Sequence, residues 1–104
     1  MRYLNDKEEK IIGTFMHNMD DYYNCTVTLK WKDGSWVIAE FDACSEDDND
    51  LELDDENYEE LTSFVFKALW VKDNPPVYIT EDLFFLVDYR NFPDEIIAAG
   101  KKIN

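Results

Sequence analysis

Hydrophobic and polar residues alternate along two runs, residues 24–31 and 35–41, which flank a loop signal at residues 32–34. Such alternation is typical of strands with one buried face, and a short loop that contains Gly between two such runs predicts a β-hairpin. A three-residue loop would place Gly34 in the left-handed position of a bulge, where a side chain would be strained.

One register of this hairpin keeps the apolar side chains on a single face. Residues i and i+2 of a strand share a face, so the face that carries Val27 and Leu29 should meet Val37 and Ala39. A two-residue turn would instead place Glu40 beside Val27 on the buried face. The three-residue loop therefore predicts four pairs: Trp31 with Ser35, Leu29 with Val37, Val27 with Ala39, and Cys25 with Phe41.

Helical spacing of apolar residues follows Asn5-x-x-Glu8, which has the form of a capping box. The apolar positions that recur after it are Ile12, Phe15, Met16 and Met19. This spacing predicts a first helix over residues 6–18. Gly13 weakens the helix, and residues 11–16 could instead form a strand.

A second helix is predicted over residues 55–70. Asp54 or Asp55 could cap it, and acids in its first turn would complement the positive end of the helix dipole. The Asn-Pro-Pro sequence at residues 74–76 ends the helix and its connection. Its apolar positions recur at i, i+3 and i+4: Leu61, Phe64, Val65, Ala68 and Leu69.

The remaining sequence predicts a second β region and a tail with two interpretations. Residues 77–80 and 83–89 are β-branched and aromatic runs, consistent with a hairpin or with one strand and a bulge. Residues 93–99 have Pro near a possible helix start and Gly after its end, and they fit a short last strand equally well.

These elements predict an α+β fold with a single domain over residues 1–104. Its antiparallel sheet of about four or five strands would be built from two hairpin regions and packed with one or two helices, in the order α-β-β-α-β-β. Five aromatic residues cannot all face one core: Phe64, Phe66, Trp70, Phe84 and Phe85. We expect helices to cover both faces of the sheet, and the alternative is an exposed aromatic anchor.

The two cysteines, Cys25 and Cys44, are not spaced as a metal knuckle or a CxxC redox pair. The hairpin register places Cys44 on the face opposite Cys25, which is outside disulfide geometry. We therefore expect two reduced, buried thiols and no disulfide.

The charge is the one extreme property of the chain, since 24 acids and ten bases give a net charge of −14. Such a chain repels nucleic acid and anionic membranes and attracts cationic surfaces, so we expect no direct nucleic-acid or membrane partner. No apolar run is long enough to span a bilayer, and the first residues do not resemble a signal peptide, so the expected compartment is the cytoplasm.

Candidate chemistry is sparse. The single histidine, His17, has no serine motif to serve, so we expect no enzymatic activity. The acidic run at residues 47–50 lacks the Gly and the preceding helix of an EF-hand, and it predicts no dedicated metal site. No cofactor motif is present, and we expect no cofactor.

The acidic tract between residues 46 and 60 is the candidate partner-binding surface, because no base lies between Lys32 and Lys67 to neutralise it. Its acids are Glu46, Asp47, Asp48, Asp50, Glu52, Asp54, Asp55, Glu56, Glu59 and Glu60. The structural alternative is a solvated loop and the outward face of a helix.

The function that uses this tract is binding of a basic protein, a nuclease or another nucleic-acid-handling protein, whose Lys and Arg residues normally contact phosphates. Toxin-immunity proteins and phage-encoded inhibitors of nuclease defence systems act in this way and serve as analogies. The alternatives are an accessory interaction domain whose acidity only provides solubility, and a small enzyme without a recognisable motif.

Overall fold

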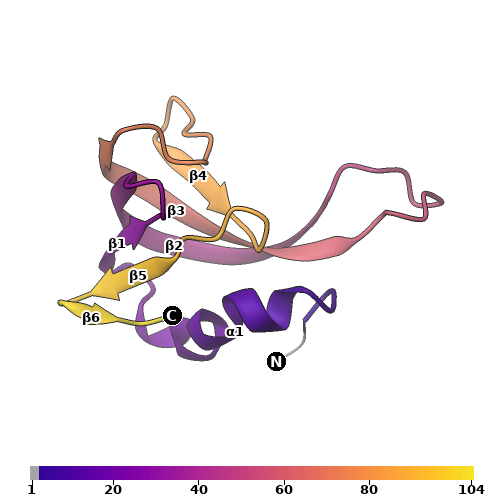
Figure 1. Ribbon diagram of the computed structural model, residues 1–104, viewed down its shortest axis with the longest axis horizontal. Helices are drawn as coiled ribbons and strands as arrows, with labels where there is room; N and C mark the ends of the chain where they lie inside the picture. Colours follow the sequence, from indigo (N-terminus) through magenta and orange to yellow (C-terminus); the bar gives the residue numbers. More distant parts are fainter. Residues whose placement is uncertain (1–2) are drawn as a thin grey trace.

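A curved antiparallel sheet of six strands lies against one α-helix in the computed structural model, which describes residues 3–104 (Figure 1). The order of strands across the sheet is β4-β3-β2-β1-β5-β6. The elements are α1 (Glu8–Asn18), a 3-10 turn (Met19–Asp21), β1 (Thr26–Lys30), β2 (Trp36–Asp48), β3 (Glu60–Lys72), β4 (Phe84–Val87), β5 (Glu95–Ala98) and β6 (Lys101–Lys102). The predicted α+β class is confirmed, with one helix and more strands than expected.

The first helix is confirmed, and the strand alternative for residues 11–16 is wrong. Asn5 Oδ1 accepts the backbone N–H of Lys7 at 3.0 Å, as a residue near a helix start often does. The Glu8 carboxylate does not return to Asn5, because it accepts the N–H of Leu4 and two hydrogen bonds from Thr62 of β3. The expected capping box is therefore replaced by a bond between the helix and the sheet.

The β1–β2 hairpin has the predicted register, with Val27 opposite Ala39 and Leu29 opposite Val37. All four side chains are buried, as expected for one shared face. Gly34 has a φ of 92°, which confirms the predicted left-handed position.

The predicted helix over residues 55–70 is wrong, because these residues form the connection after β2 and most of β3. Phe64, Phe66 and Ala68 occupy every second position and belong to the hydrophobic core. A spacing of two residues is the period of a strand, and this strand pairs with β2. Residues 61–64 are buried without interruption, so an apolar pattern of helical appearance arises by coincidence. The β-branched and aromatic content of this segment is the signal that outweighs helical spacing.

The second β region contains one strand, β4, so the hairpin interpretation of this region is wrong and the single-strand alternative is nearer, although the strand covers only Phe84–Val87. Residues 77–80 have no strand partner, although Thr80 accepts and donates hydrogen bonds at the edge of β4. The tail adopts its strand alternative, because β5 pairs with β1 and β6 pairs with β5.

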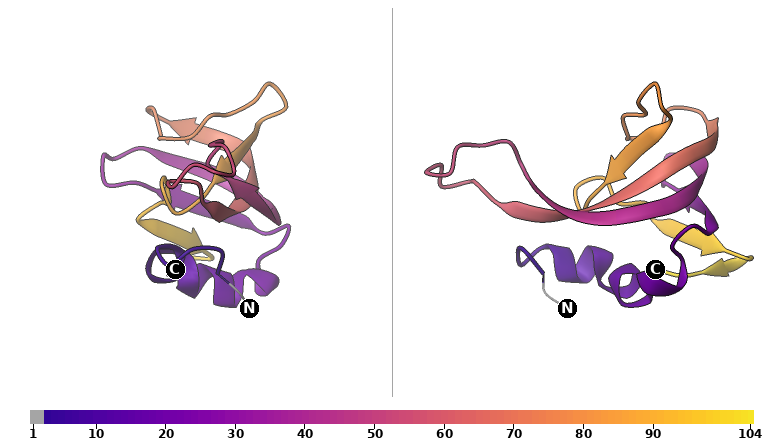
Figure 2. Two further views of the ribbon diagram at one scale, coloured as in Figure 1. Left: turned by 90° about the vertical axis from the view of Figure 1, so that its right-hand side faces the viewer. Right: turned by 180° about the vertical axis from the view of Figure 1, so that it is seen from behind.

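Two bulges distort the ladder between β2 and β3. Leu69 is the extra residue between the Ile38 and Ala39 pairs, and Asp42 is the extra residue between the Phe41 and Ala43 pairs. A bulge adds local twist and bends the strand, which accounts for the curvature of the sheet in Figure 2.

The Asp42 bulge also overturns the predicted face of Cys44. One extra residue shifts all later side chains to the other face, so Cys44 pairs with Phe64 and packs against the core. Cys25 is exposed instead of buried, and Cys44 is half-buried. Both are free thiols, and burial raises the pKa of the Cys44 thiol.

Phe15 of α1 occupies the centre of the core. The centroid of its ring lies 5.2 Å from that of Phe41 and 5.1 Å from that of Phe64. The ring planes make angles of 68° and 79°, so both contacts are edge to face. Such edge-to-face contacts are favourable beyond the apolar area that they bury. The helix and the two long strands are therefore joined through one aromatic cluster.

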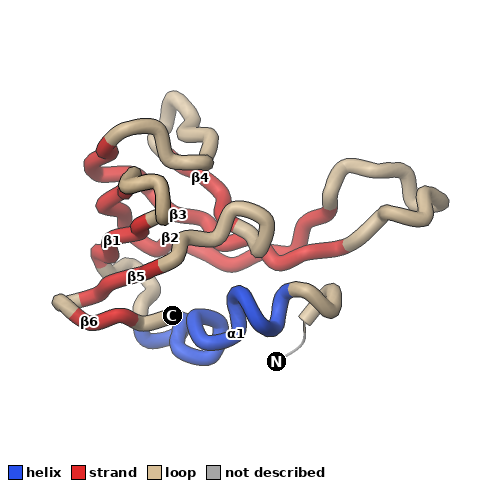
Figure 3. Tube along the Cα trace, in the orientation of Figure 1, coloured by secondary structure: helices blue, strands red, loops and turns tan. Residues whose placement is uncertain are grey.

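Within residues 3–104 the sheet is covered by a helix on one face only, so the expectation of helices on both faces is wrong (Figure 3). On the other face Trp36 and Trp70 lie 4.6 Å apart between ring centroids. Trp70 is 53% exposed. The alternative of an exposed aromatic residue therefore describes Trp70, whereas Phe64, Phe66 and Phe85 are core residues.

Replacing Gly34 by Ala should lower the free energy of unfolding by about 1 to 2 kcal/mol, because an L residue is strained at positive φ. Apart from the adjacent residues of the chain, no described atom lies within 4 Å of the added methyl group, so the effect would come from the backbone alone. Denaturant titration measures the difference, and Gly34→Asn should lose less because Asn tolerates this conformation. Equal stability of the Ala variant and the parent would contradict the assignment.

Replacing Glu8 by Ala should cost about 2 kcal/mol of unfolding free energy, because the buried N–H of Thr62 would lose its acceptor. Glu9→Ala is the matched control, since Glu9 is an exposed acid in the same helical turn. Its effect should stay within about 0.5 kcal/mol. Comparable losses in the two variants would show that Glu8 acts only as a helix-terminal charge.

Candidate protein-binding surface

Residues 46–60 form a hairpin arm that projects from the body of the molecule (Figures 1 and 3). The arm begins as the last three residues of β2, continues through a loop, and returns at Glu60, the first residue of β3. Paired backbones support its base, since Glu46 lies opposite Thr62 and Asp48 lies opposite Glu60. We refer to residues 46–60 as the acidic arm.

The structure brings the ten predicted acids together on this one projection. Three lie at the end of β2, and the others lie in the loop or at the start of β3. Asp48 and Glu59 are half-buried, and the other eight are exposed: Glu46, Asp47, Asp50, Glu52, Asp54, Asp55, Glu56 and Glu60.

Charge is distributed unevenly between the arm and the body. The arm carries ten of the 24 acids and none of the ten bases, which leaves fourteen acids and ten bases elsewhere. Exposed like charges at this density repel one another and produce a negative potential around the projection. The arm is therefore where a cationic surface would be attracted most strongly.

Hydrogen bonds of Asn49 join the two sides of the arm beyond the last strand pair. Its N–H donates to the carbonyl of Glu59 at 3.2 Å, and its Oδ1 accepts the N–H of Glu59 at 3.3 Å. Its Nδ2 donates to the carbonyl of Asn57 at 2.8 Å. The backbone and side chain of Asn49 thus extend the cross-strand hydrogen bonding beyond the last strand pair, which shortens the unpaired part of the loop.

Glu59 fastens the base of the arm to the body. Its carboxylate accepts a hydrogen bond from the Tyr89 hydroxyl and forms an ion pair with Lys7 Nζ at 3.4 Å. The Asn5 side chain donates to the carbonyl of Glu60 at 2.9 Å. The base of the arm is therefore held by residues just before α1 and by the segment after β4.

These contacts shift the pKa values of the groups that make them. The hydrogen bond to Glu59 raises the pKa of Lys7, with a further contribution from the negative charge of that carboxylate. Burial raises the pKa of Tyr89 first, and its hydrogen bond to Glu59 adds to the shift. Both groups therefore hold the protons that the contact needs to a higher pH than free side chains would.

The tip of the arm differs from the sequence prediction. No helix begins at Asp54 or Asp55, and Asp55 Oδ1 instead accepts the N–H of Asn57 within a turn. Two leucines that sequence reasoning did not single out lie among the acids, with Leu51 41% and Leu53 82% exposed. The signal that could have identified them is their position: each is an apolar residue among acids, outside the helical spacing of the other apolar residues.

Other chemistry has little support in the part of the chain that the structure describes. Residues 3–104 contain no group of three His, Cys, Asp or Glu side chains placed to hold a metal ion. His17 is exposed on the last turn of α1. Among the same residues, no helix has the length and apolar character that crossing a membrane requires.

Comparison with known proteins identifies one family. Residues 11–101 match the family model described as cognate immunity protein YxxD, and this region contains most of α1, the whole arm and five complete strands. The searches of curated proteins and of solved structures gave no match. Because the family model covers most of the sequence, this chain belongs to the cognate immunity protein YxxD family.

Proposed function

We propose that this chain neutralises a cognate toxin by binding it through the acidic arm, without catalysing a reaction. The toxin is a nuclease or another nucleic-acid-handling enzyme, and the arm occupies the cationic site that normally holds phosphates. The observation that carries the proposal is the placement of ten acids and no base on one projecting hairpin.

Electrostatics supports this choice of target. Enzymes that act on nucleic acids line their channels with Lys and Arg, which bind phosphates with little dependence on sequence. A row of carboxylates offers similar negative charge to that channel and accelerates encounter by attraction over a distance. Membership of a cognate immunity family supports a toxin as the partner.

The construction of the arm supports a role as an inserted element. Its base is fixed by the strand pairs, by Asn49 and by the contacts of Glu59 with Lys7 and Tyr89. A surface that is already ordered loses less conformational entropy on binding. At the tip, Leu51 and Leu53 provide apolar area that can remain buried in a complex after the charges have guided the encounter.

Affinity capture identifies the partner. The tagged full-length chain is incubated with extract of the source cell at low and at high salt, and the retained proteins are identified by mass spectrometry. The proposal predicts a basic protein whose retention weakens at high salt. Salt screens electrostatic attraction, and its range falls from about 8 Å at physiological ionic strength to about 3 Å at 1 M. Capture that is unaffected by salt, or capture of an acidic protein, would oppose it.

The variant Asp47→Asn, Asp48→Asn and Asp50→Asn should bind the captured toxin with an association rate constant reduced roughly tenfold at low salt. Its dissociation rate should change less, because exposed charges act mainly on encounter. Asn retains the side-chain oxygens that accept hydrogen bonds from Asp48 and Asp50, so the arm should stay folded. Surface plasmon resonance at several salt concentrations measures both rate constants.

The matched control removes three exposed acids outside the arm, in the variant Glu9→Gln, Asp20→Asn and Asp21→Asn. It changes the net charge equally and should keep a rate constant and salt dependence much closer to those of the parent. If the two variants behave alike, the attraction belongs to the whole molecule and the arm has no special part in it.

A further inference from the structure

Within residues 3–104, one edge of β2 is left open along the base of the acidic arm. β1 pairs with β2 as far as Thr26 opposite Glu40, and two backbone hydrogen bonds to Phe41 extend this contact by one residue. β2 then continues to Asp48 with β3 on its other side, and in Figure 1 this part of the strand runs outward beyond β1. The backbone groups of such an edge can pair with a further strand.

The hydrogen bonds of β3 show which groups of β2 face the open edge. The N–H of Thr62 donates to Glu8 and therefore points away from β2. In an antiparallel ladder, two residues that lie opposite each other either bond to each other or both point outward. Glu46 lies opposite Thr62, and Cys44 lies two residues earlier on the same strand. Both residues therefore direct an N–H and a C=O to the open edge, where no described residue bonds to these groups.

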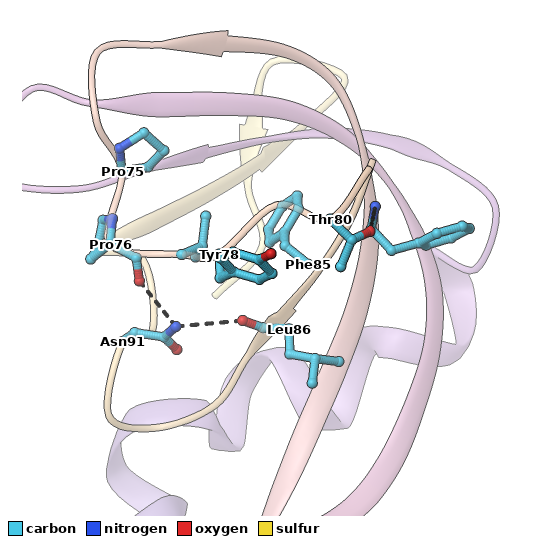
Figure 4. A pocket seen from close by; sticks show the side chains of 9 residues that line it. Pro75, Pro76, Tyr78, Thr80, Phe85, Leu86 and Asn91 are labelled. Atoms are coloured by element: carbon cyan, nitrogen blue, oxygen red, sulfur yellow. Dashed lines mark hydrogen bonds between the residues drawn. The ribbon is translucent and has the colours of Figure 1, made fainter. Parts of the chain in front are cut away.

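The outer edge of β4, by contrast, is occupied by this chain itself. Phe84 bonds to Thr80 through both its C=O and its N–H, at 2.9 and 3.2 Å. The side chain of Asn91 donates to the carbonyls of Pro76 and Leu86, as the dashed lines of Figure 4 mark. These bonds leave β4 little capacity to pair with an added strand.

The start of β3 is covered in a similar way by side chains near the start of α1. Glu8 accepts the N–H and the hydroxyl of Thr62, and the Asn5 side chain donates to the carbonyl of Glu60 at 2.9 Å. At the far end of the sheet, β6 consists of Lys101–Lys102 alone. The edge of β2 beside the arm is therefore the best place on this sheet for a further strand.

A pocket of about 400 Å³ lies beside this edge, between α1 and the base of the arm. Met16 and Met19 line it from the helix and the 3-10 turn, and Cys44 and Glu46 line it from β2. Because alternate residues of a strand share a face, a segment paired with β2 would direct every second side chain toward the pocket. Methionine side chains adapt to apolar groups of different shapes. The pocket is therefore suited to an apolar side chain of the added segment.

The surroundings of the open edge are negatively charged. Residues 40–48 contain five acids and no base. Burial raises the pKa of the Cys44 thiol, and the negative charges of Glu8 and Glu46 add to this shift. A cationic segment would therefore be attracted to this edge.

The bases of α1 and of the segment before it do not reverse this balance. Residues 8–21 carry four acids against one lysine and one histidine, Lys10 and His17. Lys7 is already paired with Glu59. None of these three basic residues lines the pocket.

We propose that the cognate toxin adds an extended, basic segment to the open edge of β2 at residues 44–46. Backbone bonds with Cys44 and Glu46 set the register, and an apolar side chain of the segment enters the pocket. Lys or Arg side chains of the same segment meet Glu46 and Asp47. In this mode of recognition the main-chain bonds provide affinity, and the alternate side chains provide specificity. The proposal rests on the proposed function, since it takes the toxin as the partner and names the part of it that the arm binds.

A basic segment fits this edge better than a second copy of the chain does. Pairing with a second copy would bring Glu46 and Asp47 near the same acids of the partner, and like charges on paired strands are destabilising. Charged side chains on an edge strand oppose self-association for this reason. The acids therefore keep the edge free of other copies and leave it available to a cationic strand.

A synthetic peptide of about eight residues that alternates Lys and Val is the probe for this edge, since strands commonly have this length. Titrated into the full chain and followed by NMR, it should give nuclear Overhauser contacts to the amide protons of Cys44 and Glu46. A control peptide with Pro in place of each Val keeps every Lys but cannot form a strand ladder. It should bind roughly tenfold more weakly. Equal affinity of the two peptides, or contacts confined to other residues, overturns the proposal.

A pair of variants at residue 46 separates the backbone contribution from charge. Glu46→Pro removes an N–H that points outward, and Glu46→Gln is the matched control because it removes the same charge and keeps the N–H. The Lys-Val peptide should bind the Pro variant roughly tenfold more weakly than the Gln variant. Equal binding by the two folded variants contradicts strand addition. If the Pro variant does not fold, the two peptides compared on the parent chain decide the question.

Failure of this proposal can be told apart from failure of the proposed function. If the peptide makes no strand contact while the Asp47→Asn, Asp48→Asn, Asp50→Asn variant still binds the captured toxin more slowly, the arm acts by charge alone and strand addition is wrong. If the peptide pairs with Cys44 and Glu46 while the captured protein does not depend on the arm, the edge is a strand-binding site and the proposed function is wrong.

Discussion

The antiparallel ladder between β2 and β3 is the interaction on which the rest of this structure depends. Its inner pairs, such as Phe41 with Phe66, bury aromatic side chains under α1. Its outer pairs, from Glu46 with Thr62 to Asp48 with Glu60, continue the same backbone hydrogen bonding into the arm. Apolar burial in the body therefore stabilises the geometry of a projection that has little core of its own.

The arm concentrates negative charge, and that repulsion must be opposed locally. Two glutamates near its base accept hydrogen bonds from the body: Glu8 of α1 from Thr62, and Glu59 of the arm from Tyr89. Glu59 also has a cation beside it in Lys7. The remaining acids of the arm are mostly exposed, where water screens their repulsion and leaves their charge available to a partner.

Local patterns predicted the parts of the fold in which one face is buried and the other is polar. The β1–β2 register, the position of Gly34 and the first helix follow from such patterns. The prediction failed at β3, where consecutive burial of residues 61–64 obscured the two-residue period. Cys44 was assigned to the wrong face because a single bulged residue, Asp42, cannot be located from alternation alone.

The acids of the candidate site could be read directly from the sequence, whereas their arrangement could not. A helix over residues 55–70 would have spread several of them over a solvated helical face, and the observed strand gathers them on a hairpin. The partners that fix its base, Lys7 and Tyr89, are separated from Glu59 by 52 and 30 positions in the chain. Such long-range contacts follow from strand pairing and leave no local pattern.

Residue-resolved amide hydrogen exchange of the free protein tests the central claim most directly. If the ladder extends into the arm, amides paired between β2 and β3 should be protected as far as Asp48 and Glu60, with rapid exchange confined to residues 50–58. Equally rapid exchange of residues 44–48 and 60–64 would show that the ladder ends at the body. The arm would then be a mobile loop instead of an ordered extension of the sheet.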